Sequence, residues 1–201
     1  LDGSTVDLSP ERCMLGQNQL GADIIMPLDE CPAAAGDQSQ VTSRKSRTKE
    51  PGHVEDGDPS RHKANLSEQP PSSTLDLGLA AFDSTRSVAQ ATERSLHWLG
   101  RCIKAHRCPN DQALFGIVQG GTDLQLRTAC AHRVIEHDLP GYAIGGVAVG
   151  EGYAGLKSVV EHTAPQLPDD RPRYLMGVGY ECDLLTAVRA GVDMFDCVLP
   201  T

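Results

Sequence analysis

Short apolar runs along this chain each end at a polar residue or at glycine. The runs cover residues 24–28, 114–118, 142–144, 174–176 and 192–195, and they end at Asp29-Glu30-Cys31, Gln119-Gly120-Gly121, Gly145-Gly146, Gly177-Val178-Gly179 and Asp196-Cys197. Stretches with helical spacing of apolar residues separate them, so the pattern predicts βα units around a parallel sheet. In a βα barrel, active-site residues lie at the carboxyl ends of the strands, which is where these polar residues fall.

Helix signals lie between the apolar runs. Ser9-Pro10-Glu11 is a typical helix start, and this helix is expected to run to about Gln19. A longer helix is expected from about Thr85 to His106, because its apolar residues recur at helical spacing. The remaining helices are expected to open at a capping box, 122–125, and to lie near 156–162 and 183–190.

Composition divides the chain into three parts. Residues 1–31 and 85–201 carry the strand and helix signals as two barrel segments, whereas residues 32–84 are rich in Ser, Pro and charged residues. From Asp37 to Gln69 the chain cannot bury enough apolar surface to offset the entropy of ordering, so we expect a disordered surface insertion there. Basic residues at 44–49 keep open a regulatory or RNA-touching arm, although acidic residues follow them closely.

The expected fold is a (β/α)8 TIM-type barrel, incomplete in this chain. A strand–helix period of roughly 20–30 residues favours a barrel over a doubly wound sheet. A closed barrel of this type takes roughly 250 residues. The chain has 201 residues, begins at Leu1 and stops at Thr201 just after a strand-like run. We therefore expect it to be part of a longer protein and to be inactive alone.

Composition also narrows the class of protein. The formal net charge of -9 argues against a chain that grips phosphates over its whole surface, so a nucleic-acid partner would need a local basic patch. The seven cysteines are dispersed without a C-x-x-C pair, which predicts a reduced, cytoplasmic protein with no zinc site readable from spacing. The sequence contains no apolar run long enough to predict a membrane-spanning helix, and no signal peptide is visible.

Carboxylates stand at two of the strand ends. Asp196 suits a nucleophile at a sugar anomeric carbon, or a structural aspartate that caps the next helix or pairs with an arginine. Strand alternation puts Asp193 on the opposite face from Asp196, and it lets only one of Asp29 and Glu30 face the site. A carboxylate there suits the two parallel N–H groups of guanine; the alternative is a solvated loop.

Amide and glycine groups follow the other strands. Gln119 offers both a donor and an acceptor to a ligand, or is a strand-end amide satisfied by nearby backbone. Gly120-Gly121 allows close approach of a backbone. The Gly145-Gly146 turn suits backbone N–H groups directed at a carbonyl oxygen, a phosphate site, or simply a tight turn, and 177–179 has the same ambiguity.

Taken together, these strings resemble tRNA-guanine transglycosylase. The resemblance covers residues 1 to about 31 and about 85 to 201, and the stretch between does not match. It rests on several long motifs in the right order: Asp2-Gly3-Ser4, Gly21-Ala22-Asp23-Ile24-Ile25-Met26 leading to Asp29-Glu30-Cys31, Ile117-Val118-Gln119-Gly120-Gly121, Tyr142-Ala143-Ile144-Gly145-Gly146, Arg173-Tyr174-Leu175-Met176-Gly177-Val178-Gly179 and Asp193-Met194-Phe195-Asp196-Cys197-Val198.

The resemblance implies an enzyme that replaces guanine at the first anticodon position of certain tRNAs by a 7-deazaguanine base, queuine or its precursor. It implies Asp196 as the nucleophile that forms a covalent aspartyl-ribose intermediate. The base would be bound by Asp29, Gln119, Gly146, Val147 and Met176, and RNA would be contacted by Gly177, Val178, Gly179, Tyr180, Glu181, Cys182, Asp183 and Thr201. The implied partners are tRNA, guanine and 7-deazaguanine bases, and a second subunit in a homodimer or in a heterodimer with a family relative.

Two strings of that family do not occur in this chain. One is Asp-Ser-Gly-Gly, which carries the general acid/base. The other is the set of structural zinc ligands, a Cys-x-Cys-x-x-Cys run with a later His. We expect the first before Leu1, and the zinc ligands after Thr201. The basic surface that faces tRNA is expected outside the chain as well.

Two other functions stay open at this point. One is a non-catalytic, tRNA-binding accessory relative, and the other is an unrelated barrel enzyme that holds phosphate at Gly145-Gly146. A scaffold has no need of Asp196, Asp29 and Gln119 together, so their joint presence favours the enzyme. The unrelated enzyme leaves the other strand-end residues without a role.

The replacement base is a separate question. Cys31 after the guanine-binding acid is typical of bacterial-type sequences. Val149 stands where eukaryotic sequences place an extra glycine, and its branched side chain favours the small aminomethyl base over queuine. Gly179-Tyr180 and the long insertion look more eukaryotic than bacterial.

Overall fold

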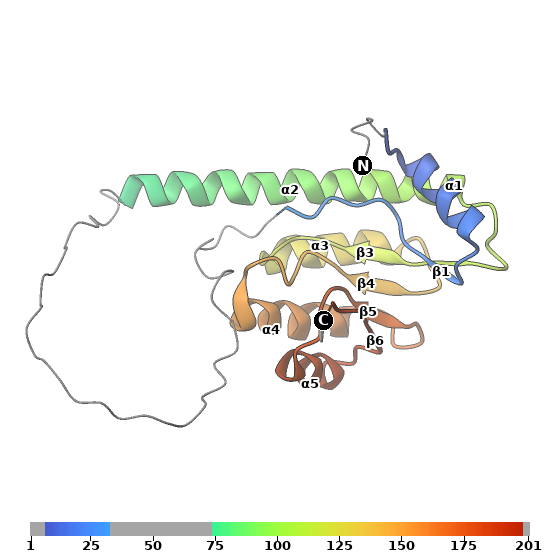
Figure 1. Ribbon diagram of the computed structural model, residues 1–201. Helices are drawn as coiled ribbons and strands as arrows, with labels where there is room; N and C mark the ends of the chain where they lie inside the picture. Colours follow the sequence, from blue (N-terminus) through green and yellow to red (C-terminus); the bar gives the residue numbers. More distant parts are fainter. Residues whose placement is uncertain (1–6, 33–73, 199–201) are drawn as a thin grey trace, which may run out of the picture.

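The computed structural model describes residues 7–32 and 74–198 (Figure 1). The expected insertion from Asp37 to Gln69 and the expected RNA contact at Thr201 lie outside these residues. The elements are α1 (Pro10–Leu20), β1 (Ile24–Ile25), α2 (Thr74–Ala105), β2 (Ala113–Leu114), β3 (Gly116–Val118), α3 (Leu124–Ile135), β4 (Tyr142–Ile144), α4 (Gly152–Thr163), the short 3-10 helix η2 (Ala164–Gln166), β5 (Arg173–Leu175), α5 (Glu181–Arg189) and β6 (Met194–Phe195).

Every pair of neighbouring strands is parallel. β1 pairs with β2, and β3, β4, β5 and β6 pair in that order. Phe115 alone separates β2 from β3, and its N–H donates to the Ile25 carbonyl oxygen at 3.0 Å. β2 and β3 therefore follow one another along one extended segment of the chain. Apart from β2 and β3, consecutive strands are paired neighbours joined by helix-containing connections, which confirms the predicted α/β class with parallel sheets. β1 and β6 are the edges of the described sheets, and the closed eight-stranded barrel stays a prediction.

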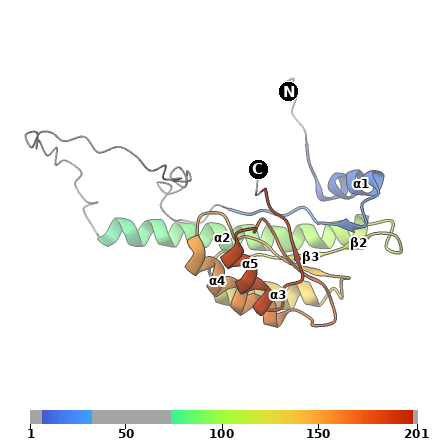
Figure 2. The ribbon, with the colours of Figure 1, turned by 60° about the horizontal axis from the view of Figure 1, so that its bottom comes forward.

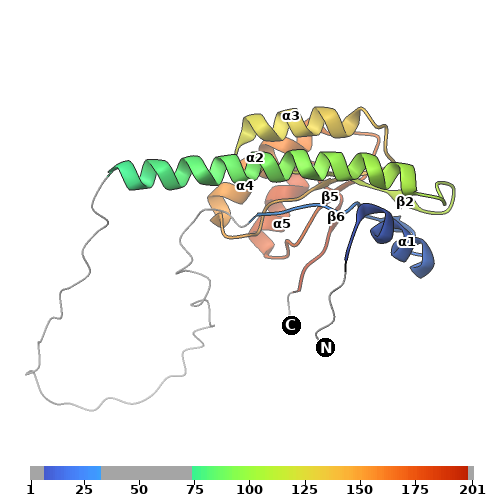
Figure 3. The same ribbon diagram turned by 90° about the horizontal axis from the view of Figure 1, so that it is seen from above.

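The helices cover one face of this sheet. α2, α3, α4 and α5 each contact the next one in the chain, and they lie side by side in Figures 1 and 3. α1 packs on α2 and lies apart from the α3–α5 layer, near β1 and β2 (Figure 2). None of the described helices combines the length and the apolar character needed to cross a lipid bilayer.

Two apolar clusters hold these layers together. The larger cluster joins the strands to α3, α4 and α5 and contains the fully buried Val134, Ile144 and Val160. The smaller cluster lies under α1 and joins Met14 and Ile25 to β2 and α2. The larger cluster extends to the carboxyl ends of the strands, where it includes Val118, Ile144 and Leu175, so the polar strand-end side chains stand on an apolar base.

Helix boundaries follow local capping chemistry. The Ser9 hydroxyl accepts a hydrogen bond from the Arg12 N–H at 3.3 Å, and Gly21 ends α1 with φ of 69°, which confirms the predicted start and agrees with the predicted end to within two residues. The prediction of a capping box with Thr122 as the cap was wrong. Asp123 caps α3 instead, because its carboxylate accepts from the Gln125 and Leu126 N–H groups, both at 3.0 Å. α2 begins at Thr74, well before the expected Thr85.

Candidate active site

The predicted strand-end residues lie at one edge of the sheet. Because the strands are parallel, their carboxyl ends share that edge. Residues that follow β1, β3, β4, β5 and β6 meet there: Asp29, Gln119, Gly146, Gly177 and Asp196. Two groups of direct contacts result, one around Asp29 and one around Asp196.

The first group joins Asp29, Gln119 and the glycine pair. The Gln119 amide Nε2 donates to Asp29 Oδ2 at 2.6 Å, and Gln119 is 2% exposed. Burial raises the pKa of the Asp29 carboxyl, and the hydrogen bond from Gln119 opposes that rise. A Cβ at Gly146, whose φ is 66°, would overlap Gln119 Oε1, and one at Gly145 would lie 2.8 Å from its Nε2. The glycines therefore let the Gln119 amide lie directly on the turn.

Glu30, the acid adjacent to Asp29, has a different environment. Glu30 forms a surface ion pair with Arg94, and its N–H donates to Ser95 Oγ at 2.9 Å. Only Asp29 turns toward Gln119, as strand alternation predicts. Asp29 has no cationic partner among the described residues, so none of them neutralises its charge.

Arg127 lies beneath the glycine pair, and the sequence analysis missed it. Its side chain is fully buried on α3, and its hydrogen bonds all go to main-chain carbonyl oxygens. Nη2 donates to the Gly145 and Gly146 oxygens at 2.9 and 3.1 Å, while Nε and Nη1 donate to Gly121 and Val118 at 2.6 and 3.4 Å. Burial lowers the pKa of Arg127 to about 10, so the guanidinium stays charged at neutral pH.

A signal for Arg127 was present in the sequence. The buried positions of α3 are 127, 130, 131 and 134, which recur at helical spacing. An arginine in that apolar stripe needs hydrogen-bond partners inside the protein, because burying an unpaired charge is unfavourable.

The second group fixes Asp196. The Tyr174 hydroxyl donates to Asp196 Oδ1 at 2.6 Å, and the Gly177 N–H donates to the same oxygen at 2.8 Å. No other described residue bonds Oδ2, and the Asp196 residue is exposed. Burial, together with the bond to Asp196, raises the pKa of Tyr174 to about 12, so its hydroxyl remains a donor. The carboxylate is thus oriented through one oxygen while the other is open.

Asp193 lies on the other side of β6. Its Oδ2 accepts from the Arg173 N–H at 2.8 Å at the start of β5, away from Asp196. This agrees with the predicted opposite orientation of the two aspartates. Asp196 forms no ion pair with an arginine among the described residues, and a helix that it could cap would follow residue 198, outside them.

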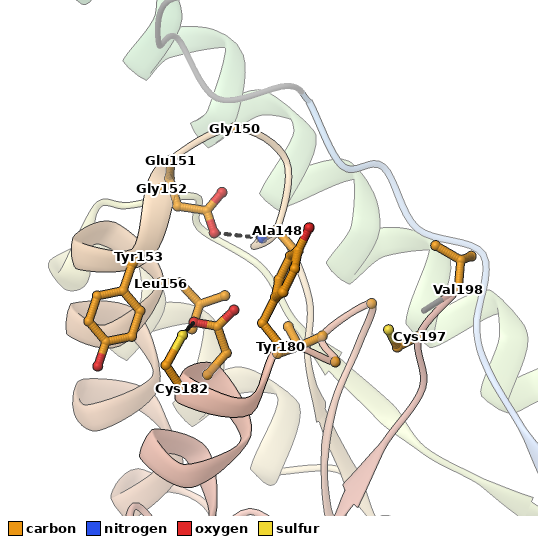
Figure 4. Close-up of a pocket in the computed structure, with 14 residues that line it drawn as sticks. Ala148, Gly150, Glu151, Gly152, Tyr153, Leu156, Tyr180, Cys182, Cys197 and Val198 are labelled. Atoms are coloured by element: carbon orange, nitrogen blue, oxygen red, sulfur yellow. Dashed lines mark hydrogen bonds between the residues drawn. The ribbon is translucent and has the colours of Figure 1, made fainter. Parts of the chain in front are cut away.

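A pocket of about 770 Å³ lies between the loops that follow β4, β5 and β6 (Figure 4), and it is lined by Gly177, which bonds Asp196, and by Cys197, which follows it. Six of the predicted RNA-contacting residues line it: Gly177, Val178, Gly179, Tyr180, Cys182 and Asp183. The other walls come from residues 148 and 150–153, Leu156, Cys197 and Val198. The Glu151 carboxylate accepts from the Ala148 and Val149 N–H groups at 2.6 and 2.9 Å and so shapes the first loop.

Three other predicted site residues have different surroundings. Glu181 begins α5 and does not line the pocket. The Val147 side chain packs in the larger apolar cluster, which leaves its backbone for a ligand. The Met176 N–H donates to the Ile144 oxygen at 3.3 Å, so Met176 stands at the end of β5 beside the glycine pair.

The zinc site that the resemblance implies is expected after Thr201, outside the described residues. Within residues 7–32 and 74–198, no three His, Cys, Asp or Glu side chains converge as a metal site would require. The structure therefore assigns no zinc ligand to this part of the chain.

Comparison with known proteins gives a consistent result. A family model described as queuine tRNA-ribosyltransferase matches residues 1–52 and 74–201. Curated proteins named queuine tRNA-ribosyltransferase from Cyanothece sp., Synechococcus elongatus and Geobacillus kaustophilus are 42%, 40% and 40% identical to the chain. Each of these alignments covers the whole of this chain. The chain spans 40% of the length of each of these relatives.

Proposed function

The chain belongs to the queuine tRNA-ribosyltransferase family, and on that premise we propose that the protein exchanges guanine at the first anticodon position of tRNA for a 7-deazaguanine base. The observation that carries the proposal is the meeting of three groups at one sheet edge. These are the Asp29–Gln119 pair, the glycine turn and the oriented Asp196. An accessory, non-catalytic relative would have no use for an oriented, open carboxylate.

Asp196 is the nucleophile in this proposal. Its open Oδ2 attacks the ribose anomeric carbon, and the bond from that carbon to guanine N9 breaks with its electron pair going to the base. Tyr174 and Gly177 hold Oδ1, so the attacking oxygen is presented in one orientation. The departing base takes a proton from a general acid outside the described residues. The incoming base then gives its N9 proton to the group that protonated guanine, forms a bond from N9 to the same carbon, and the bond from that carbon to Asp196 breaks to release the carboxylate.

The base is recognised by the Asp29 group. The Asp29 carboxylate accepts the ring N–H and the exocyclic amine of guanine, and the backbone N–H of Gly146 donates to the base oxygen. Gln119 and Val147 complete that edge, and Met176 covers the ring. Adenine is rejected because it would leave these buried polar groups unpaired. The target base must leave its stack to enter the site.

The pocket beside Asp196 is proposed to face the RNA. Its loop 177–183 follows β5, so RNA bound there would place a flipped nucleotide above Asp196. Thr201 would extend the same surface. The structural zinc of the proposal, and the second subunit of a homodimer or heterodimer, would involve residues other than those described.

The test is a covalent trap with full-length protein and substrate tRNA. Wild-type protein is expected to retain tRNA on a denaturing gel and to incorporate labelled guanine, and Asp196→Ala is expected to lose both. Asp193→Ala is the matched control, since this acid lies three residues away on the opposite side of the strand. Normal exchange by Asp196→Ala would refute the assignment, and tRNA binding without any adduct in wild type would favour the accessory relative.

A further inference from the structure

The Arg127 side chain is hydrogen-bonded to the glycine turn that receives the base in the proposed function. Arg127 has no role in the exchange reaction as proposed above. Arg127 Nη2 donates to the carbonyl oxygens of Gly145 and Gly146, at 2.9 and 3.1 Å. The same guanidinium reaches back to Val118 and Gly121, at the end of β3. One buried group therefore ties together the two strand ends that carry Gln119 and the glycine pair.

The direction of these bonds fixes the opposite face of the turn. A trans peptide is planar, so its N–H points away from its own C=O. With the carbonyls of Gly145 and Gly146 held toward Arg127, the N–H groups of Gly146 and Val147 point away from it. The Cys31 thiol lies on that side: burial raises the pKa of the thiol, and the nearby Gly146 N–H opposes the rise. Cys31 lies two residues beyond Asp29, on the base-binding side.

Neighbouring positions leave Arg127 little freedom to move. A Cβ at Gly120, whose φ is 137°, would lie 2.8 Å from Arg127 Cγ and 2.9 Å from its N, and one at Gly146 would lie 3.3 Å from Nη2. A Cβ at Gly146 would therefore meet both the Gln119 amide and the Arg127 guanidinium. No carboxylate among the described residues forms an ion pair with Arg127, although the charge of Glu151 favours its charged form, so its direct contacts are with main-chain carbonyls.

We propose that Arg127 is a positioning residue that presets the Gly146 and Val147 N–H groups as a donor pair for the carbonyl oxygen of the guanine base. The proposal rests on the proposed function, because it concerns the same base site. When the bond from the ribose to N9 breaks, its electron pair moves into the purine ring and negative charge grows on the base oxygen. Donors already aimed at that oxygen, and polarised by a cation behind them, stabilise this charge without rearranging.

The test compares two bases that differ in one atom. Guanine and 6-thioguanine share the ring N–H and the exocyclic amine that Asp29 accepts, but sulfur is the poorer acceptor for a backbone N–H. In full-length protein, Arg127→Gln is expected to weaken guanine binding by roughly ten- to hundred-fold, as misplaced donors do, and 6-thioguanine binding by a clearly smaller factor. Arg127→Lys keeps the charge but lacks the two-pronged geometry, so an intermediate loss is expected.

Arg133→Gln is the matched control, because this arginine lies on the same helix and forms only a surface ion pair with Glu93. It should leave both affinities unchanged. Equal losses for the two bases in Arg127→Gln would show a merely structural role and overturn the proposal, as would no loss at all.

A wild-type measurement covers the case in which neither Arg127 variant folds. The guanidinium nitrogen signals of Arg127 are expected to shift in NMR spectra when guanine binds and to shift less with 6-thioguanine, since hydrogen bonds on the two sides of a peptide polarise each other. Identical shifts, or none, would overturn the proposal. Wild-type protein that binds guanine without exchanging it would instead count against the proposed function alone, and wild type that binds no guanine would overturn both.

Discussion

Asp29→Asn offers a sharp test of the base site, because it is expected to move affinity and stability in opposite directions. The carboxylate of Asp29 is buried enough to raise its pKa, and its one hydrogen-bond partner is the neutral Gln119 amide at 2.6 Å. Ionised Asp29 is therefore held in the folded protein at a free-energy penalty. Replacing it by a neutral amide of the same shape removes the penalty, so the free energy of unfolding should stay the same or rise.

Guanine binding should fall in the same variant. Hydrogen bonds to a charged group contribute about 1.5–3 kcal/mol each, and guanine would donate two to the Asp29 carboxylate. Asparagine carries one oxygen and one NH2 group, so at least one of these bonds becomes a contact between two donors. The expected loss is about 2–4 kcal/mol, which corresponds to roughly thirty- to thousand-fold in affinity.

The pH dependence adds a second signature. Because the pKa of Asp29 is raised, the folded protein binds this proton more tightly than the unfolded chain does. Its contribution to stability is present at pH below the unfolded value and is lost as pH rises through the folded value. Guanine affinity has the opposite trend, since it needs the ionised form and weakens as pH falls through the same raised value. Asp29→Asn should flatten both curves.

The assay is calorimetric titration of full-length protein with guanine, alongside thermal unfolding, over a pH series. Glu30→Gln is the matched control, since this neighbouring acid lies in a surface ion pair with Arg94 that is worth little. Unchanged guanine affinity in Asp29→Asn would refute the base-binding role. A large loss of stability in step with affinity would show that Asp29 serves mainly to hold the fold.

Three further substitutions test neighbouring parts of the site. Tyr174→Phe removes one of the two bonds that orient Asp196 and is expected to slow formation of the tRNA adduct by roughly three- to ten-fold in quench-flow experiments; an unchanged rate would show that the Gly177 N–H suffices. Gly146→Ala places a Cβ against Gln119 Oε1 at a positive φ, so about 1–3 kcal/mol of stability and most guanine binding should be lost, as measured by thermal unfolding and titration. Normal binding in that variant would mean that the turn can shift freely. Val149→Gly removes branched bulk beside the turn and should raise incorporation of queuine relative to the aminomethyl base in a competition assay; a constant ratio would show that Val149 does not set the pocket size.

Much of the site's layout could be predicted from the sequence because it depends on local periodicity. A run of apolar residues that ends at Asp29, Gln119 or Asp196 marks a strand end, and parallel pairing brings such ends to one edge. Alternation along a strand also predicted that Asp29 and Glu30 face different directions, and that Asp196 and Asp193 do so too. These inferences need only the geometry of a single strand.

The features that were missed depend on contacts between distant segments. The place of Arg127 in the apolar stripe of α3 shows that it is buried but not what it binds: its partners are carbonyl oxygens at 118, 121, 145 and 146, and a carbonyl belongs to every residue. Tyr174 meets Asp196 only because β5 and β6 pair. The start of α2 at Thr74 was missed for a different reason: the boundary was drawn by composition, although residues 75–82 already contain good helix formers.

The charged side chains of the site share one property that separates them from the charges elsewhere on the protein. The ion pairs among the described residues all join side chains that are at least 38% exposed, and none involves Asp29, Arg127 or Asp196. Those three are held by an amide, by carbonyl oxygens, and by a hydroxyl and a backbone N–H. Neutral partners fix geometry without cancelling charge.

Because no ion pair neutralises Asp29 or Arg127 among the described residues, the empty site holds both charges at a free-energy penalty. Burial raises the pKa of Asp29 and lowers that of Arg127, and both shifts mean that the charged form is disfavoured in the empty site. Two N–H donors from guanine would favour ionised Asp29, and a base oxygen that gains electrons would favour charged Arg127 through the intervening peptides. In the proposed exchange both penalties would be relieved, that of Asp29 by the bound base and that of Arg127 by the reaction, so part of the folding free energy would contribute to transition-state binding.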